Sequence, residues 1–180
     1  MDFNFAQSYF ELFGLPVGFD VDSDQLKTRY QKLQSELHPD RFAGADAQAK
    51  RLSVQATSLV NEAYGTLRDP RLRARYLLHL KGVEFDDERE TSSDPEFLMQ
   101  QMELRERLDE SAEAEDALNR LDTFIAEVRT QARSLDEAFA AQYAAEDIAA
   151  AKDSVLKMRF HARLIEEAQA RQARLEDELL

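Results

Sequence analysis

Residues 26–42 have the sequence LKTRYQKLQSELHPDRF, which combines a helical pattern with a proline-containing turn. Its apolar side chains recur at helical spacing and fall within about 60° of a helical wheel: Leu26, Tyr30, Leu33 and Leu37. Because proline disfavours the α conformation in the residue before it, this helix is expected to end at about His38. His38, Pro39 and Asp40 are therefore expected together at the solvent-exposed tip of a helical hairpin.

Helical patterns also lie on both sides of this tip. A short helix is expected between Ser8 and Gly14, and the helix that carries Leu26 is expected to begin at a cap on Asp22 or Ser23. A third helix is expected from a cap near Asp46 to about Leu67. Its apolar stripe, which can pack against the second helix, consists of Leu52, Ala56, Leu59, Val60, Ala63 and Leu67.

A fourth helix is expected to begin at Asp69-Pro70 and to stop before Gly82. Its expected buried side consists of Leu72, Tyr76, Leu77 and Leu80. The first half of the chain is therefore predicted to be a helical hairpin flanked by two short helices.

Three cationic residues of the second helix, Lys27, Arg29 and Lys32, lie outside its apolar arc and are expected on its exposed surface. Arg41 follows just beyond the turn. Three scattered cations usually form no more than a solvated face. Here their closeness to the histidine and carboxylate of the tip favours a docking surface instead.

The first half resembles a J-domain over about 75 residues. The resemblance rests on Tyr9–Leu15 (YFELFGL), Tyr30–Leu33 (YQKL), His38–Phe42 (HPDRF) and Asn61–Leu67 (NEAYGTL), in that order. It implies that the His38-Pro39-Asp40 tip, with Lys27, Arg29, Lys32 and Arg41, binds a DnaK-class ATPase chaperone. The ATP chemistry would then belong to that partner.

An enzyme is the alternative interpretation of His38 and Asp40 as an acid–base pair. No nucleophile, glycine-rich phosphate loop or orienting third residue accompanies them, so no catalytic site is predicted. The chain contains no cysteine, and its three histidines are far apart in sequence, so no metal site and no cofactor are expected. The N-terminus lacks the features of a secretory or mitochondrial targeting segment, which predicts a cytoplasmic protein.

The net charge of −13 is placed unevenly along the chain. Residues 1–80 hold ten acidic and ten basic side chains, whereas residues 81–180 hold 26 acidic and 13 basic ones. Such asymmetry indicates two modules with different partners, although acidity can also serve solubility alone. The acidic half is expected to repel nucleic acid, so no nucleic-acid partner is predicted. The predicted organisation is a J-domain over residues 1–81, a linker over 82–93 and a second domain over 94–180.

Residues 94–180 predict three helices that pack as an antiparallel bundle. The first starts at Asp94-Pro95, the second runs from about Ala112 towards Tyr143, and the third runs from about Asp147 to near the C-terminus. The apolar side expected of the third is Ile148, Ala151, Val155, Met158, Ala162 and Ile165, with Leu156, Phe160 and Leu164 lying away from it. A coiled-coil homodimer is the competing interpretation of such stripes.

The first of these helices has two apolar faces. With Phe97 at zero on a helical wheel, Leu104 and Leu108 fall within roughly 20° of it, as expected for a core side. Leu98, Met102 and Met99 fall at about 100°, 140° and 200°, where the same core cannot bury them. Flanked by Glu103 and Glu106, this second face predicts a protein contact. Coverage by the first half of the chain or by the linker is the alternative.

The sequences FLMQQMELRE at residues 97–106 and LKMRF at residues 156–160 resemble the first and last C-terminal helices of HscB-type co-chaperones. With the J-domain, this resemblance covers nearly the whole chain. It implies that Leu98, Met99, Met102, Glu103, Glu106 and Phe160 bind the iron–sulfur cluster scaffold IscU. The scaffold would then be delivered to the DnaK-class chaperone HscA. The zinc-binding cysteines of eukaryotic members are missing. A J-domain adaptor for another client, and a structural homodimer, remain open.

Overall fold

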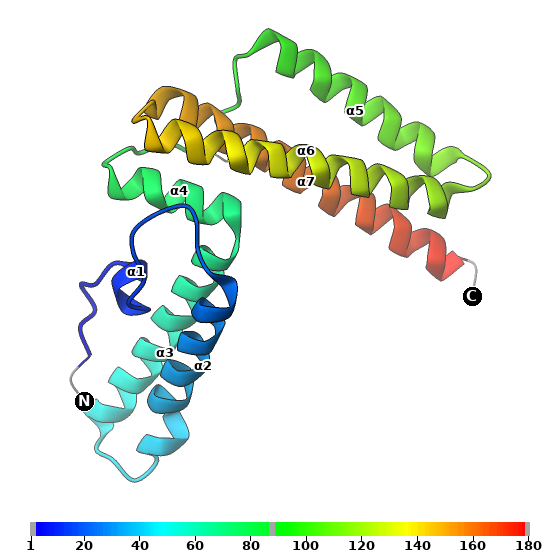
Figure 1. Ribbon diagram of the computed structural model, residues 1–180. Coiled ribbons are helices and arrows are strands. Elements are labelled where there is room, and N and C mark those ends of the chain that lie inside the picture. The colour runs from blue at the N-terminus through cyan, green and yellow to red at the C-terminus, as the bar shows by residue number, and fades with distance from the viewer. Residues whose placement is uncertain (1–2, 87–88, 179–180) are drawn as a thin grey trace. The chain divides into compact units, whose positions relative to one another are not determined.

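The computed structural model describes residues 3–86 and 89–178, and every regular element in these ranges is helical (Figure 1). The helices are α1 (Tyr9–Leu12), α2 (Ser23–Leu37), the 3-10 helix η1 (Pro39–Phe42), α3 (Ala47–Arg68), α4 (Pro70–Leu80), α5 (Pro95–Glu113), α6 (Ala117–Ala144) and α7 (Ile148–Glu178). The predicted all-α fold is confirmed. The chain divides into two compact units, Met1–Gly82 and Val83–Leu180.

Aspartate side chains cap the N-termini of α2, α3 and α4 in the first unit. Asp22 accepts hydrogen bonds from the backbone N–H groups of residues 24 and 25, and Asp46 accepts one from that of residue 49. Asp69 caps α4 in the same way, with Pro70 at the first helical position. These caps satisfy N–H groups that have no partner inside a helix. They place the ends of α2, α3 and α4 close to the positions expected from sequence.

The core of the first unit lies between α2, α3 and the two short helices. Its fully buried large side chains include Phe10, Phe13, Leu26, Val60, Leu67, Leu77 and Leu78. The prediction for α4 is wrong at Leu80, which is 42% exposed. Ala74 and Leu78 are buried with Leu77 instead, because α4 is short and its inward side is fixed by contact with α3 rather than by its own apolar pattern.

Aromatic residues hold the short α1 in place. The Tyr9 ring stacks on Tyr76 of α4 at 4.3 Å, and its hydroxyl donates to Glu62 of α3 across 2.7 Å. Partial burial, together with this hydrogen bond, raises the pKa of Tyr9 well above its usual range. A helix of four residues is too short to be stable alone, so these tertiary contacts stabilise it.

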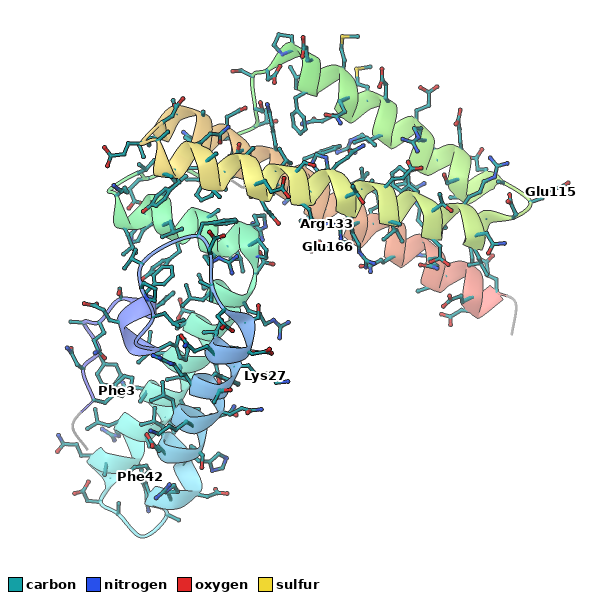
Figure 2. All side chains as sticks on the ribbon, in the orientation of Figure 1. Phe3, Lys27, Phe42, Glu115, Arg133 and Glu166 are labelled. Carbon is teal, nitrogen blue, oxygen red and sulfur yellow. The ribbon has the colours of Figure 1, made fainter. Side chains whose placement is uncertain are left out.

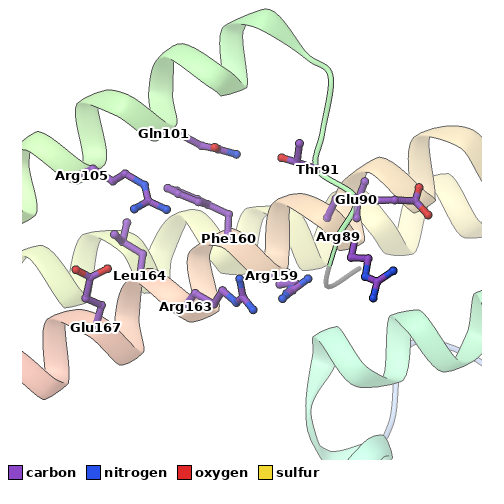
Figure 3. A pocket seen from close by; sticks show the side chains of 11 residues that line it. Arg89, Glu90, Thr91, Gln101, Arg105, Arg159, Phe160, Arg163, Leu164 and Glu167 are labelled. Carbon is purple, nitrogen blue, oxygen red and sulfur yellow. The ribbon is translucent and has the colours of Figure 1, made fainter. Parts of the chain in front are cut away.

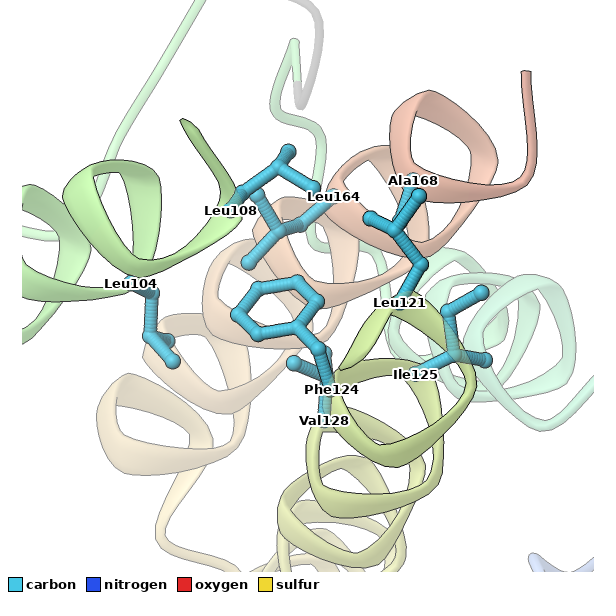
Figure 4. Close-up of a cluster of buried hydrophobic side chains, with 8 residues drawn as sticks. All are labelled: Leu104, Leu108, Leu121, Phe124, Ile125, Val128, Leu164 and Ala168. Carbon is cyan, nitrogen blue, oxygen red and sulfur yellow. The ribbon is translucent and has the colours of Figure 1, made fainter. Parts of the chain in front are cut away.

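The second unit is an antiparallel bundle of α5, α6 and α7, as predicted (Figure 1). Its core cluster, drawn in Figure 4, contains Leu104, Leu108, Leu121, Phe124, Ile125, Val128, Leu164 and Ala168. Leu164 is therefore a core residue, and its assignment to the outer side of α7 is wrong. Over this half of α7 the buried side passes through Leu164 and Ala168, while Ala162 and Ile165 are only partly buried.

The start of α6 was also predicted too early. Ala112 belongs to α5, and α6 begins at Ala117 rather than near Ala112. Residues 111–117 read SAEAEDA, without glycine or proline, so local propensity marks no break between the two helices. The turn is set by the packing of α5 on α6.

The segment before α5 belongs to the second unit and packs against its helices. Ser92 is 2% exposed, and Glu90 forms an ion pair with Lys152 of α7 across 2.6 Å. The predicted linker boundaries, 82 and 93, stay a prediction, and residues 87 and 88 lie outside the described residues. In the described ranges, none of the helices is both long enough and apolar enough to cross a bilayer.

Candidate functional sites

The His38-Pro39-Asp40 tip lies between α2 and α3 and is open to solvent. His38 has an extended conformation (φ −55°, ψ 130°), and Pro39 begins η1 directly after it. The His38 Nδ1 atom accepts a hydrogen bond from the Asp40 backbone N–H across 3.3 Å and lies 3.5 Å from Asp40 Oδ2. The side chains of His38 and Asp40 are 52% and 91% exposed. The tip is therefore a compact polar corner that presents both functional groups outward.

The backbone under this corner is fastened to α3. The carbonyl oxygen of Leu37 accepts hydrogen bonds from Ser53 Oγ (2.6 Å) and Thr57 Oγ1 (3.2 Å). This carbonyl ends α2 and has no partner within its own helix, so the two hydroxyl groups satisfy it. Ser53 is fully buried. A corner with exposed side chains thus stands on an ordered backbone.

Of the predicted cationic residues, Lys27, Lys32 and Arg41 are exposed, and Figure 2 shows the Lys27 side chain directed away from α2. Arg29 differs, because it is partly buried and its Nη1 group donates to the carbonyl oxygens of Phe13 and Gly14. The expectation that Arg29 lies on the exposed surface is therefore wrong. Its guanidinium ties α2 to the turn after α1, where Gly14 has a positive φ of 57°.

The outer face of α5 is exposed. Leu98, Met99 and Met102 are 41%, 65% and 73% exposed, and Glu103 and Glu106 beside them are exposed as well. Phe97, Leu104 and Leu108, on the opposite side of the helix, are buried. The division of α5 into two faces that the helical wheel predicts is confirmed.

Phe160 of α7 packs against the inner side of α5. It is partly buried, and its ring packs edge-on against Phe97 at a centroid distance of 5.6 Å. The structure thus places Phe160 beside α5, while Leu98, Met99 and Met102 project from that helix. The tip and the outer face of α5 belong to different units.

The start of α5 is held by an ionic contact that sequence reasoning missed. Asp94 caps α5 and receives a hydrogen bond from Lys157 Nζ across 2.7 Å, and Lys157 also contacts Asp153 at 2.9 Å. The bond from Lys157 lowers the pKa of Asp94. Partial burial acts to lower the pKa of Lys157, but the two carboxylates raise it overall.

His161 is a second residue that sequence reasoning missed. It is 2% exposed, its ring stacks on Phe97, and its Nδ1–H donates to the Lys157 carbonyl oxygen across 2.9 Å. Burial lowers the pKa of His161, which favours the neutral ring. Its position three residues after Met158 and three before Leu164 could have identified it as part of the buried side of α7.

Neither site has the donor set of a metal centre. Among residues 3–86 and 89–178, no group of three or more histidine and carboxylate side chains is arranged to hold an ion. His38 and Asp40 offer one imidazole and one carboxylate at an open corner. This chemistry suits recognition of a charged partner rather than exclusion of water from a reaction.

Known proteins resemble both units. The family description "DnaJ domain" matches residues 8–76, and "HSCB C-terminal oligomerisation domain" matches residues 93–169. The chain is 40% identical over 173 residues to a co-chaperone protein HscB homolog of Vibrio cholerae, covering 96% of this chain and 99% of that protein. It is 42% identical over 169 residues to the homolog of Burkholderia mallei, covering 94% and 96%.

Solved structures share the fold over most of the chain. Chaperone HscB from Vibrio cholerae superposes with a TM-score of 0.83 at 39% identity, covering 97% of this chain and 100% of that one. Human co-chaperone protein HscB superposes with a TM-score of 0.86 at 31% identity, covering 94% and 84%. Yeast Jac1 co-chaperone, with a TM-score of 0.72 at 19% identity over 92% and 96%, shares the fold.

Proposed function

Since the chain belongs to the HscB family of J-domain co-chaperones, we propose that it binds the iron–sulfur cluster scaffold protein IscU and delivers it to the DnaK-class chaperone HscA. It stimulates the ATPase of HscA and so assists the maturation of iron–sulfur proteins. One observation carries the proposal: an exposed His-Pro-Asp corner lies on one unit and an exposed apolar face on the other.

The corner serves as the chaperone contact in this proposal. Asp40 presents a carboxylate that can pair with an arginine of HscA, and Pro39 keeps the turn rigid. Lys27, Lys32 and Arg41 orient the encounter with an acidic surface of the chaperone. Arg29 acts indirectly, since it fixes α2 to the turn that contains Gly14.

ATP hydrolysis then takes place entirely on HscA. A co-chaperone that binds one arrangement of the chaperone's domains more tightly than another shifts the chaperone towards that arrangement. This coupling requires an exposed and well-ordered contact, but no catalytic residue in this chain. The hydrogen bonds from Ser53 and Thr57 to Leu37 provide the ordered backbone.

The outer face of α5 serves as the client contact. Leu98, Met99 and Met102 supply apolar surface that is stabilised when a partner covers it, and methionine adapts its shape readily. Glu103 and Glu106 form a charged rim that favours a complementary basic client surface. Phe160 extends the apolar contact from α5 to α7.

A titration of HscA and IscU with two classes of variant tests the proposal. His38→Gln or Asp40→Asn should abolish stimulation of the HscA ATPase while the circular dichroism spectrum and the IscU affinity are retained. Leu98→Ala with Met102→Ala should weaken IscU binding about tenfold, as expected for the centre of a contact, and leave basal stimulation intact. Val54→Ala, at an equally exposed residue of α3, is the control.

Three results would contradict the proposal in different ways. Stimulation of HscA without any binding of IscU would indicate a J-domain adaptor for another client. A concentration-dependent doubling of mass with no effect on the ATPase would indicate a structural homodimer. Turnover of a substrate by the purified chain alone would indicate an enzyme.

A further inference from the structure

A pocket of about 210 Å³ lies within the second unit, where the segment before α5 meets α5 and α7 (Figure 3). Four of its lining residues are arginines: Arg89, Arg105, Arg159 and Arg163. Residues 81–180 hold only 13 basic side chains against 26 acidic ones, so these four are a large share of the cations in that half. Such a concentration of guanidinium groups in an acidic unit indicates a site for an anion.

The two carboxylates in the pocket wall are engaged by cations that are not among its lining residues. Glu90 Oε2 lies 2.6 Å from Lys152 Nζ, and Glu167 Oε1 lies 2.8 Å from Arg171 Nη2. The hydrogen bond from Lys152 lowers the pKa of Glu90, which favours the ionised form of that carboxylate. Each of the two wall carboxylates therefore has a cationic partner outside the pocket lining.

Arg105 is held at the pocket by an aromatic contact. Its guanidinium carbon lies 5.7 Å from the centroid of Phe160, whose ring packs against Phe97. A guanidinium stacked on a ring keeps the N–H groups at its edge available to an acceptor. Within the described ranges, Arg105 forms no ion pair with a carboxylate. Arg89 pairs with Asp86 across 3.4 Å, but its side chain is 89% exposed, so this pair contributes little.

Arg105 lines the pocket together with Phe160, and it follows Met102 of the proposed client face by three residues on α5, so the two are neighbours on the surface of that helix. We propose that the pocket receives an aspartate or glutamate side chain of IscU, next to the apolar contact of Leu98, Met99 and Met102. This inference rests on the proposed function. Guanidinium groups can pair with a carboxylate through two parallel hydrogen bonds, and a carboxylate fits better than a phosphate because Glu90 and Glu167 in the wall disfavour a more highly charged group.

The test is calorimetry of IscU binding to the full chain with Arg105→Gln, Arg163→Gln and the double variant. Arg129→Gln, which removes one exposed cation of α6 outside the pocket, is the matched control. We expect the double variant to bind about tenfold more weakly at low salt and the control within twofold. The difference should shrink in about 0.5 M salt.

Neutral replacements in IscU, Asp→Asn and Glu→Gln one at a time, identify the partner group. At least one replacement should weaken binding to the wild-type chain while weakening binding to Arg105→Gln much less. The inference would be overturned if the double variant lost no more IscU affinity than Arg129→Gln does. It would also be overturned if no single IscU carboxylate accounted for the loss of affinity. Either result would leave the proposed function standing. Failure of the wild-type chain to bind IscU would refute both.

Discussion

Single residues in this chain take roles that their sequence neighbours do not indicate. Arg29 lies among the cations of α2, but its guanidinium reaches the carbonyl oxygens of Phe13 and Gly14 on another segment. A helical wheel places side chains around one helix and gives no information on what a long side chain reaches across it. Lys27 and Lys32 are exposed, as the helical wheel predicts.

His161 shows the same limit for a buried polar group. Its ring lies between Phe97, the Lys157 carbonyl oxygen and the Gln131 amide, whose Oε1 is 3.2 Å from Nε2. Lys157 is the nearest cation among these neighbours and is engaged by Asp94 and Asp153. Burial lowers the pKa of the His161 imidazole, because a proton would add a charge to a site shielded from water.

The lowered pKa of His161 predicts a pH-dependent stability. Below the usual histidine value of about 6.5, the unfolded chain binds a proton that the folded chain does not, so the free energy of unfolding falls as the pH falls. The contribution of His161 to the free energy of unfolding is fully present above about pH 6.5. Below that pH it is lost at up to about 1.4 kcal/mol per pH unit. Denaturant unfolding at several pH values measures this slope.

His161→Gln should unfold with a shallower slope between about pH 6.5 and 5.5, because its amide does not titrate there. The wild-type chain and the variant share all other carboxylates and histidines, so the difference in slope isolates His161. Identical slopes would show that the buried ring does not resist protonation.

Among the helices, α5 has one apolar side that packs in the bundle and a second that is exposed to solvent. Phe97, Leu104 and Leu108 pack into the bundle, while Leu98, Met99 and Met102 face outward. A helix normally places apolar residues on one side only. The contacts that hold α5 in the bundle come from its capping residue Asp94, bonded to Lys157, and from its inner side, which contributes Leu104 and Leu108 to the core cluster.

Paired substitutions on α5 should separate stability from binding. Leu104→Ala removes a side chain that is 3% exposed and should lower the free energy of unfolding by about 2–4 kcal/mol. Met102→Ala, at 73% exposure, should change it by less than about 0.5 kcal/mol. Denaturant unfolding of both variants measures the contrast. A large loss of stability in Met102→Ala would mean that this face is covered within the chain.

At the scale of the whole molecule, the proposed function divides between the two compact units. The surface proposed to contact the chaperone lies on the unit Met1–Gly82, and the surface proposed to contact the client lies on Val83–Leu180. The charge follows the same division, since the excess of acidic residues lies entirely after residue 80. Separate contacts allow one protein to hold a client and a chaperone at the same time.

This division predicts that defects at the two surfaces combine additively. Asp40→Asn combined with Leu98→Ala and Met102→Ala should lose ATPase stimulation as Asp40→Asn does, and lose IscU affinity as the α5 variant does. Agreement within about 0.5 kcal/mol, or roughly twofold in affinity, is expected for sites without shared partners. Calorimetry and ATPase rates on the same preparations measure it. A much larger departure would indicate that the two surfaces are coupled.

The amino-acid sequence was enough to predict the all-α fold, the ends of α2, α3 and α4, and the two faces of α5, because caps, proline and helical periodicity are local properties. It predicted the corner at His38 and the exposed face at Met102 for the same reason. The roles of Arg29, Leu164 and His161, the start of α6, and the gathering of Arg105 and Arg163 at one pocket depend on the packing of the helices. These features depend on which segments meet in space, and no periodicity within one helix encodes that.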